Sequence, residues 1–139
     1  MGDTCNQQRS IKEIALWICN AVASENRITI TNINSADHGC EAFSHGLYFL
    51  YDVHDEVAYI GMTATEKQSL YHRIQKNGNG AHKGKGWFTE IRYVKFHKFS
   101  KYDKRQLALA ERIAIKEMNP GYNDKYVNPS NVFQFNWFE

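Results

Sequence analysis

Cysteine is scarce in this chain. Cys5, Cys19 and Cys40 are its three cysteines, an odd number without paired spacing. This pattern argues against a secreted scaffold held together by disulfides. We therefore expect the protein to work in a reducing compartment.

Long apolar runs are missing too. No stretch approaches the roughly 20 apolar residues that a membrane-spanning helix requires. Met1–Cys5 lacks the basic start and the apolar stretch of a signal peptide. There is no internal repeat, no low-complexity segment, and no zinc-finger or helix-turn-helix motif. We expect a soluble, cytoplasmic protein that makes no membrane contact and has no dedicated sequence-reading domain.

Positive charge is concentrated in one segment. Residues 1–70 hold 4 Lys/Arg and 9 Asp/Glu, whereas residues 73–105 hold 10 and 2, a net charge of +8. Aromatic residues interleave with these charges from Trp87 to Phe99. Such a segment is either an ordinary solvated face or a surface that follows the phosphates of a nucleic acid, and charge alone leaves both open.

With 139 residues, 42% of them apolar, the chain can bury one core, which predicts a single domain. Three stretches carry apolar residues at helical spacing. We expect these helices to run from Ser10 to about Ser24, from Thr65 to about Lys76, and from Asp103 to just before Pro120. The first two open on capping boxes, in which side chains satisfy the free amides of the first turn. Leu70 and Ile74 should face inward.

Strand-like alternation marks the remaining elements. The predicted strands are Arg27–Thr31, His45–Asp52, Val57–Thr63 and Glu90–Phe99, with a loop over residues 32–43. The four residues between the second and third strands indicate a hairpin. This connection places Tyr48 opposite Gly61 and Tyr59 opposite Leu50, so both tyrosines point to the same face. A loop of odd length would separate them, and packing against the sheet alone would explain both rings.

Glu111 is the most informative charged residue. On the last predicted helix it shares a face with Leu107, Ala110, Ala114 and Met118, while Arg112 and Lys116 lie on the other face. A carboxylate within an apolar stripe is costly unless its charge is compensated. Glu111 therefore either pairs with a buried cationic side chain, which is the commoner case, or binds a metal ion.

Two triplets in the hairpin, Gly46-Leu47-Tyr48 and Tyr59-Ile60-Gly61, are followed by Arg73, Glu111 and Asn123 in a fixed order. Together they resemble the GIY-YIG nuclease family, with Leu in place of Ile in the first triplet. Each triplet alone is a weak signal, but five ordered matches in suitable secondary structure are a strong one. The resemblance covers about residues 44–125.

The resemblance implies an α/β fold of the α+β type, with a small three-stranded antiparallel sheet flanked by helices and an extra N-terminal helix. It places the nuclease domain at residues 44–125. Residues 1–43 would form the N-terminal helix and an extension that pack on the core, and residues 126–139 a C-terminal tail. It also implies a divalent-metal-dependent endonuclease that hydrolyses DNA and leaves 5′-phosphate and 3′-hydroxyl ends.

The resemblance also implies roles. Glu111 would bind Mg²⁺ or Mn²⁺, because Mg²⁺ keeps several waters and takes ligands from substrate phosphate. Tyr48 would take the proton from the attacking water, and a phenol with an ordinary pKa of about 10 needs positive charge nearby to do so. Arg73 would supply that charge and neutralise the phosphate. Tyr59 would orient water or phosphate. Asn123 would hydrogen-bond to backbone or to a catalytic side chain, unless it is simply a turn asparagine.

This chain departs from the family at one position. Some members carry a His four residues after the catalytic Arg, where this chain has Asn77. His82 could act as base or phosphate donor instead, or it could be an exposed loop histidine. The residues expected to contact nucleic acid are Lys76, Lys83, Lys85, Trp87, Arg92 and Lys95. His38, Cys40 and His45 are too sparse a set to predict a zinc site with any weight.

A non-catalytic nucleic-acid-binding module on the same fold is the alternative function. It predicts salt-dependent affinity without hydrolysis. The joint presence of Tyr48, Tyr59, Arg73 and Glu111 favours the nuclease, because a binding module has no physical need for the carboxylate. Specificity would come from the N-terminal helix, residues 80–87, a homodimer or a partner protein. The biological setting would be restriction, repair or mobile-element biology.

Overall fold

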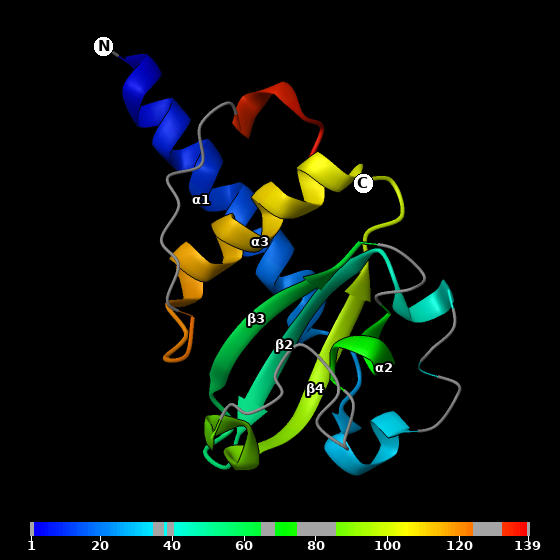
Figure 1. Cartoon of the computed structure of the whole chain (residues 1–139). Coiled ribbons are helices and arrows are strands. Elements are labelled where there is room, and N and C mark those ends of the chain that lie inside the picture. Colours follow the sequence, from blue (N-terminus) through cyan, green and yellow to red (C-terminus); the bar gives the residue numbers. More distant parts are fainter. Residues whose placement is uncertain are drawn as a thin grey trace.

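A four-stranded antiparallel sheet organises the fold (Figure 1). The computed structural model describes residues 2–34, 38, 41–64, 69–74, 86–123 and 132–138. The strands are β1 (Ile28–Thr29), β2 (Gly46–Asp52), β3 (Val57–Thr63) and β4 (Ile91–Lys98), in the order β1-β4-β2-β3. The helices are α1 (Gly2–Ala23), α2 (Leu70–Arg73) and α3 (Lys104–Met118). Short 3₁₀ helices are η1 (Ile30–Asn34), η3 (Glu41–Phe43), η5 (Gly86–Glu90) and η6 (Val132–Gln134).

The α+β class is confirmed, but the sheet has four strands rather than the expected three. The additional strand is β1, in which Ile28 pairs with Val94 and Thr29 with Tyr93. It stays short because the chain turns into the 3₁₀ helix η1 at Ile30. The alternation at residues 27–31 was therefore a real but brief strand.

Two helix starts were predicted wrongly. The first helix begins at Gly2 rather than Ser10, and no proline or glycine between Asp3 and Ser10 interrupts it. The second helix begins at Leu70 rather than Thr65, because Ser69 is extended, with φ −64° and ψ 172°. Residues 65–68 and 75–76 of that predicted helix lie outside the described residues. Leu70 and Ile74 are buried, as expected.

The hairpin and the last helix are confirmed. Tyr48 lies opposite Gly61 and Leu50 opposite Tyr59, with a register shift only after Leu50. The carboxylate of Asp103 accepts a hydrogen bond of 2.7 Å from the backbone N–H of Gln106 and so caps α3. The hairpin register therefore places Tyr48 and Tyr59 on one face of the sheet, and the start of α3 fixes the position of Glu111 along that helix.

The sheet separates two apolar clusters. On one face, α1 and α3 pack against inward side chains of the central strand, such as Phe49 (Figure 1). Trp137 joins this cluster and accepts, through its carbonyl, a hydrogen bond of 2.5 Å from the Tyr102 hydroxyl. On the other face, η1, α2 and η5 cover Tyr48 and Leu50. Tyr48 thus lies on the face that the two long helices do not cover.

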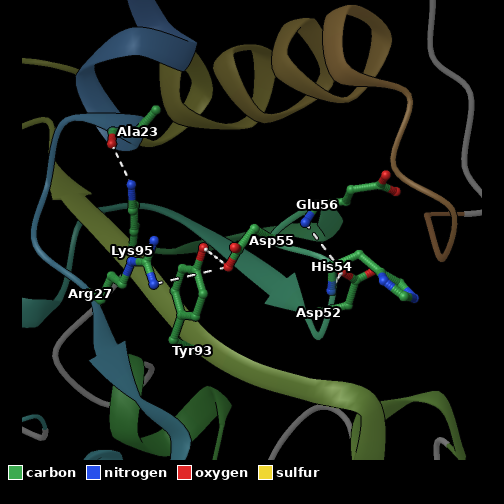
Figure 2. A network of polar contacts seen from close by, with 8 residues as sticks. All are labelled: Ala23, Arg27, Asp52, His54, Asp55, Glu56, Tyr93 and Lys95. Carbon is green, nitrogen blue, oxygen red and sulfur yellow. Dashed lines mark hydrogen bonds and ion pairs between the residues drawn. The ribbon is translucent and has the colours of Figure 1, made fainter.

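Polar contacts tie the β2–β3 turn and the end of α1 to β4 (Figure 2). The Asp52 carboxylate accepts two backbone N–H groups of the turn, at 2.8 Å and 3.2 Å. The Tyr93 hydroxyl donates to Asp55 at 2.9 Å. Lys95 donates to the carbonyl of Ala23 at 2.7 Å. Among the described residues, no helix has the length and apolar character needed to cross a membrane.

The buried thiol and phenol on the α1 face predict alkaline instability. Burial raises the pKa of Cys19 from 9.0 to about 12 and the pKa of Tyr51 from 10.0 to about 12. The folded chain keeps protons that the unfolded chain loses. The resulting loss of stability is therefore absent below the pKa values of the unfolded chain, and it grows as the pH rises toward the pKa values of the folded chain. We expect the free energy of unfolding, measured with urea, to fall between about pH 9 and about pH 11.

Tyr51→Phe is the matched control for this effect. It keeps the ring, which stacks on Tyr93 at 4.7 Å, and removes the titrating hydroxyl. The alkaline fall in stability should be smaller in this variant. An equal fall in both proteins would show that Tyr51 does not contribute.

Candidate active site

Tyr48 forms the centre of the candidate site. Its side chain is fully buried, and its ring crosses directly over Gly61 of the neighbouring strand. A Cβ atom on Gly61 would lie 2.3 Å from both Cζ and Oη of Tyr48. Gly61 therefore makes room for the phenol ring itself.

A second glycine holds β2 close to β4. A Cβ atom on Gly46 would lie 2.0 Å from the carbonyl oxygen of His97. Each glycine of the two triplets therefore meets a steric requirement of the sheet around Tyr48. The two triplets are therefore explained in part by local packing.

Tyr59 points to the same face of the sheet as Tyr48, as the register predicted. The two ring centroids are 6.4 Å apart. Tyr59 is half-buried, while Tyr48 is completely enclosed. The pair thus leads from the interior toward the protein surface.

Arg73 approaches Tyr48 from α2. Its charge and a side-chain hydrogen bond both act on the Tyr48 hydroxyl. Its Nε atom is buried and has no hydrogen-bond partner among the residues that the structure describes. A buried N–H without a partner is costly, by about 1–3 kcal/mol. A phosphate oxygen would satisfy this donor in the planar geometry that guanidinium groups favour.

Glu111 approaches from α3, which lies against β3. The side chain is half-buried, and its charge acts on Tyr48. Arg112 and Lys116 are exposed, as predicted. Met118, expected on the same buried stripe, is 40% exposed because it lies in the last turn of the helix.

Burial dominates the acidity of Tyr48. Desolvation raises the pKa of the phenol well above its ordinary value, and the nearby Tyr59 and Glu111 raise the pKa further. The charge and hydrogen bond of Arg73 lower the pKa but do not outweigh burial. Arg73 thus acts on the pKa of Tyr48 in the direction expected from the sequence, but burial outweighs it. Tyr48 is protonated at neutral pH.

Asn123 fixes the strand that carries Tyr59 and Gly61. Its side-chain amide accepts from the backbone N–H of Ile60 at 2.8 Å and donates to the carbonyl of Ile60 at 3.0 Å. The backbone N–H of Tyr122 donates to the carbonyl of Ala58 at 2.9 Å. This segment therefore satisfies the outer edge of β3 in the way that another strand would.

Aromatic rings continue outward from Tyr59. Trp87 stacks on Tyr59 with centroids 5.3 Å apart, and Tyr122 stacks on Trp87 at 4.8 Å with an interplanar angle of 7°. The Tyr122 hydroxyl donates to Glu90 at 2.7 Å. The sequence reading included Trp87 but missed Tyr122. Tyr122 directly precedes the predicted site residue Asn123, and this position was the sequence signal that could have identified it.

The structure brings together only part of the predicted nucleic-acid surface. Arg92 is exposed at the start of β4, where it donates to the carbonyl of Thr89 at 3.0 Å. Lys95 lies on the opposite face of the sheet from Tyr48 and reaches the end of α1 (Figure 2). The predicted residues Lys76, His82, Lys83 and Lys85 lie outside the described residues.

Glu111 is the candidate metal ligand near Tyr48. Within the described part of the chain, no three His, Cys, Asp or Glu side chains gather at one place, and Cys40 of the weak zinc prediction is not described. Glu111 offers one carboxylate. That donor set fits a hard cation such as Mg²⁺, which retains waters and takes substrate oxygens as ligands.

Comparisons of the chain with protein-family models, with curated proteins and with solved structures find no match.

The close contact between Gly61 and Tyr48 predicts the effect of Gly61→Ala. The added methyl would overlap the phenol ring, so Tyr48 or the strand must shift. We expect the free energy of unfolding to fall by about 1–3 kcal/mol in chemical denaturation. Gly121→Ala is the matched control, because no atom lies within 4 Å of its added Cβ. Equal stabilities of the two variants would contradict the packing described above.

Proposed function

We propose that this protein is a metal-dependent endonuclease of the GIY-YIG type that hydrolyses DNA phosphodiester bonds. The observation that carries the proposal is the convergence on one buried phenol: Tyr59, Arg73 and Glu111, from three different elements, all act on Tyr48. A guanidinium and a carboxylate that both act on one hydroxyl suit phosphoryl chemistry, in which positioning and charge stabilisation dominate. The resemblance of the ordered motifs adds independent support.

Glu111 would hold Mg²⁺ or Mn²⁺ in this proposal. Such a cation stabilises charge on the phosphate oxygens when bound. Arg73 would bind the scissile phosphate through its fork of N–H donors, including the buried Nε that has no partner among the described residues. Arg73 would thereby stabilise the negative charge that grows on the phosphate as the bond breaks.

Tyr48 would act on the attacking water only in the loaded site. In the protein alone, burial and the Glu111 charge keep its pKa high. Neutralising the charge of Glu111 removes one cause of that rise, while the hydrogen bond from Arg73 continues to favour the phenolate. Tyr59, beside Tyr48, would orient the water or the phosphate. Asn123 would hold β3, and with it Tyr59, in register.

The products would carry 5′-phosphate and 3′-hydroxyl ends. Cutting both strands of a duplex would need a homodimer, a partner protein or two successive nicks. Restriction, repair and mobile-element transfer are the settings that fit such an activity. Mapped cut sites on a long duplex separate them, because a fixed sequence favours restriction.

A binding-only module on the same fold is the second candidate. The burial of Tyr48 favours it, since a phenol with a raised pKa is a poor base without further help. This module would bind nucleic acid with strong salt dependence and hydrolyse nothing. Nicking of supercoiled plasmid in Mg²⁺ or Mn²⁺ but not in EDTA would favour the nuclease. If the plasmid stays intact, a gel-shift salt titration separates the binding module from a nuclease with a very narrow recognition sequence.

Glu111→Gln tests the metal role. The amide keeps the size of the side chain and removes its charge. We expect metal-dependent nicking of supercoiled plasmid to fall by about 10²–10³-fold or more while the thermal unfolding curve stays close to that of the parent. Glu117→Gln on the same helix is the control, because Glu117 pairs with the exposed Lys12 and is not among the residues that act on Tyr48. Full activity of the Glu111→Gln variant would remove the metal role from this residue.

Arg73→Lys tests the phosphate role. Lysine keeps the positive charge but lacks the planar fork and the Nε donor. We expect the single-turnover cleavage rate at saturating Mg²⁺ to fall by about tenfold or more. Arg112→Lys, at an exposed position of α3, should leave the rate unchanged. If the Arg73→Lys variant is as active as the parent, the positive charge alone is sufficient. That result would argue against bidentate binding of the phosphate by Arg73.

A further inference from the structure

A column of four aromatic rings runs from the centre of the candidate site to the surface. Tyr48 and Tyr59 are 6.4 Å apart, Tyr59 and Trp87 5.3 Å, and Trp87 and Tyr122 4.8 Å. The interplanar angles decrease outward, from 33° to 25° to 7°. The outer two rings are therefore nearly parallel, so a flat ligand placed on Tyr122 would continue the same offset stacking.

Tyr122 ends this column at the surface. One face of its ring lies on Trp87, and the residue is 37% exposed. Its hydroxyl is held by Glu90 at 2.7 Å, and its backbone N–H is held by Ala58 at 2.9 Å. An exposed aromatic ring held in a fixed orientation loses little conformational freedom when a flat ligand stacks on it.

The charge beside Tyr122 indicates which part of a nucleic acid it contacts. The Glu90 carboxylate at the edge of the ring repels phosphate. A nucleobase is neutral and has two flat faces. Within a duplex those faces are covered by neighbouring bases, whereas an unpaired base exposes them.

We infer that Tyr122 stacks an unpaired base of the nucleic acid close to the scissile bond, so that the preferred substrate contains single-stranded or extruded nucleotides. The inference deepens the proposed function and rests on it, because the column begins at Tyr48, on which Arg73 acts. Base–aromatic stacking contributes about 1–3 kcal/mol per base and is tolerant of sequence. It would supply affinity without a sequence-reading domain.

Binding to two single-stranded oligomers of equal length tests the inference. One is oligothymidylate, and the other is an abasic deoxyribose-phosphate chain with the same number of phosphates. The Glu111→Gln protein is used in Mg²⁺, so that binding is measured without cleavage. We expect oligothymidylate to bind about fivefold or more tightly than the abasic chain. In the Tyr122→Leu, Glu111→Gln protein this preference should fall severalfold, and in Tyr122→Phe it should persist.

The ratio of the two affinities distinguishes stacking from a structural role of the ring. A tyrosine that only holds η5 against β3 would, when replaced, weaken binding of both oligomers equally and leave the ratio unchanged. That result would overturn the inference, as would a ratio near one in the parent protein or no binding of either oligomer. Plasmid cleavage by the wild-type protein is scored separately. A base preference lost in Tyr122→Leu without any plasmid cleavage would support the stacking site and reject hydrolysis.

Discussion

The close packing of the Tyr48 ring over Gly61 is the constraint on which the rest of the site depends. A Cβ atom at Gly61 would come within 2.3 Å of the phenol, so only glycine permits the ring to cross β3. Because the ring crosses there, its hydroxyl can be influenced by Arg73 from α2 and by Glu111 from α3. The strand register and the glycine at position 61 are thus both required to place the Tyr48 hydroxyl near these charged groups. A slip of the hairpin by one residue would move Tyr48 to the α1 face and separate it from Arg73 on α2.

The same packing creates a conflict between burial and reactivity. A fully enclosed phenol is well positioned, but desolvation raises its pKa and opposes its use as a base. Arg73 works against this effect, and Glu111 adds to it until its charge is neutralised. If the proposed activity is correct, the site is held in an inactive ionisation state until cation and phosphate are both present. Such coupling would limit unwanted proton transfer in the free protein.

Sequence reasoning succeeded where local patterns decide the structure. The four-residue connection fixed the register of Tyr48 and Tyr59, and Asp103 marked the start of α3. It failed where a local pattern was taken for an element boundary. Ser10 resembles a helix start but lies within α1, because nothing before it ends the helix. Lys95 counted as part of a basic surface, yet strand alternation and the free carbonyl at the end of α1 place it on the opposite face from Tyr48. Tyr122 was missed because stacking on Trp87 joins residues that are remote in sequence.

The edge of β3 explains why the candidate site and the aromatic column occur together. An edge strand exposes unpaired backbone groups that must be satisfied or covered. Here Asn123 bonds both backbone groups of Ile60 through its side chain, and Tyr122 bonds Ala58 through its backbone. The residues that close the edge therefore place an aromatic ring beside Trp87 and immobilise the strand that carries Tyr59. On the opposite face, α1 and α3 pack into a separate apolar cluster. Substitutions of the apolar residues in that cluster should act mainly on stability, whereas substitutions along the β3 edge act on the geometry of the site.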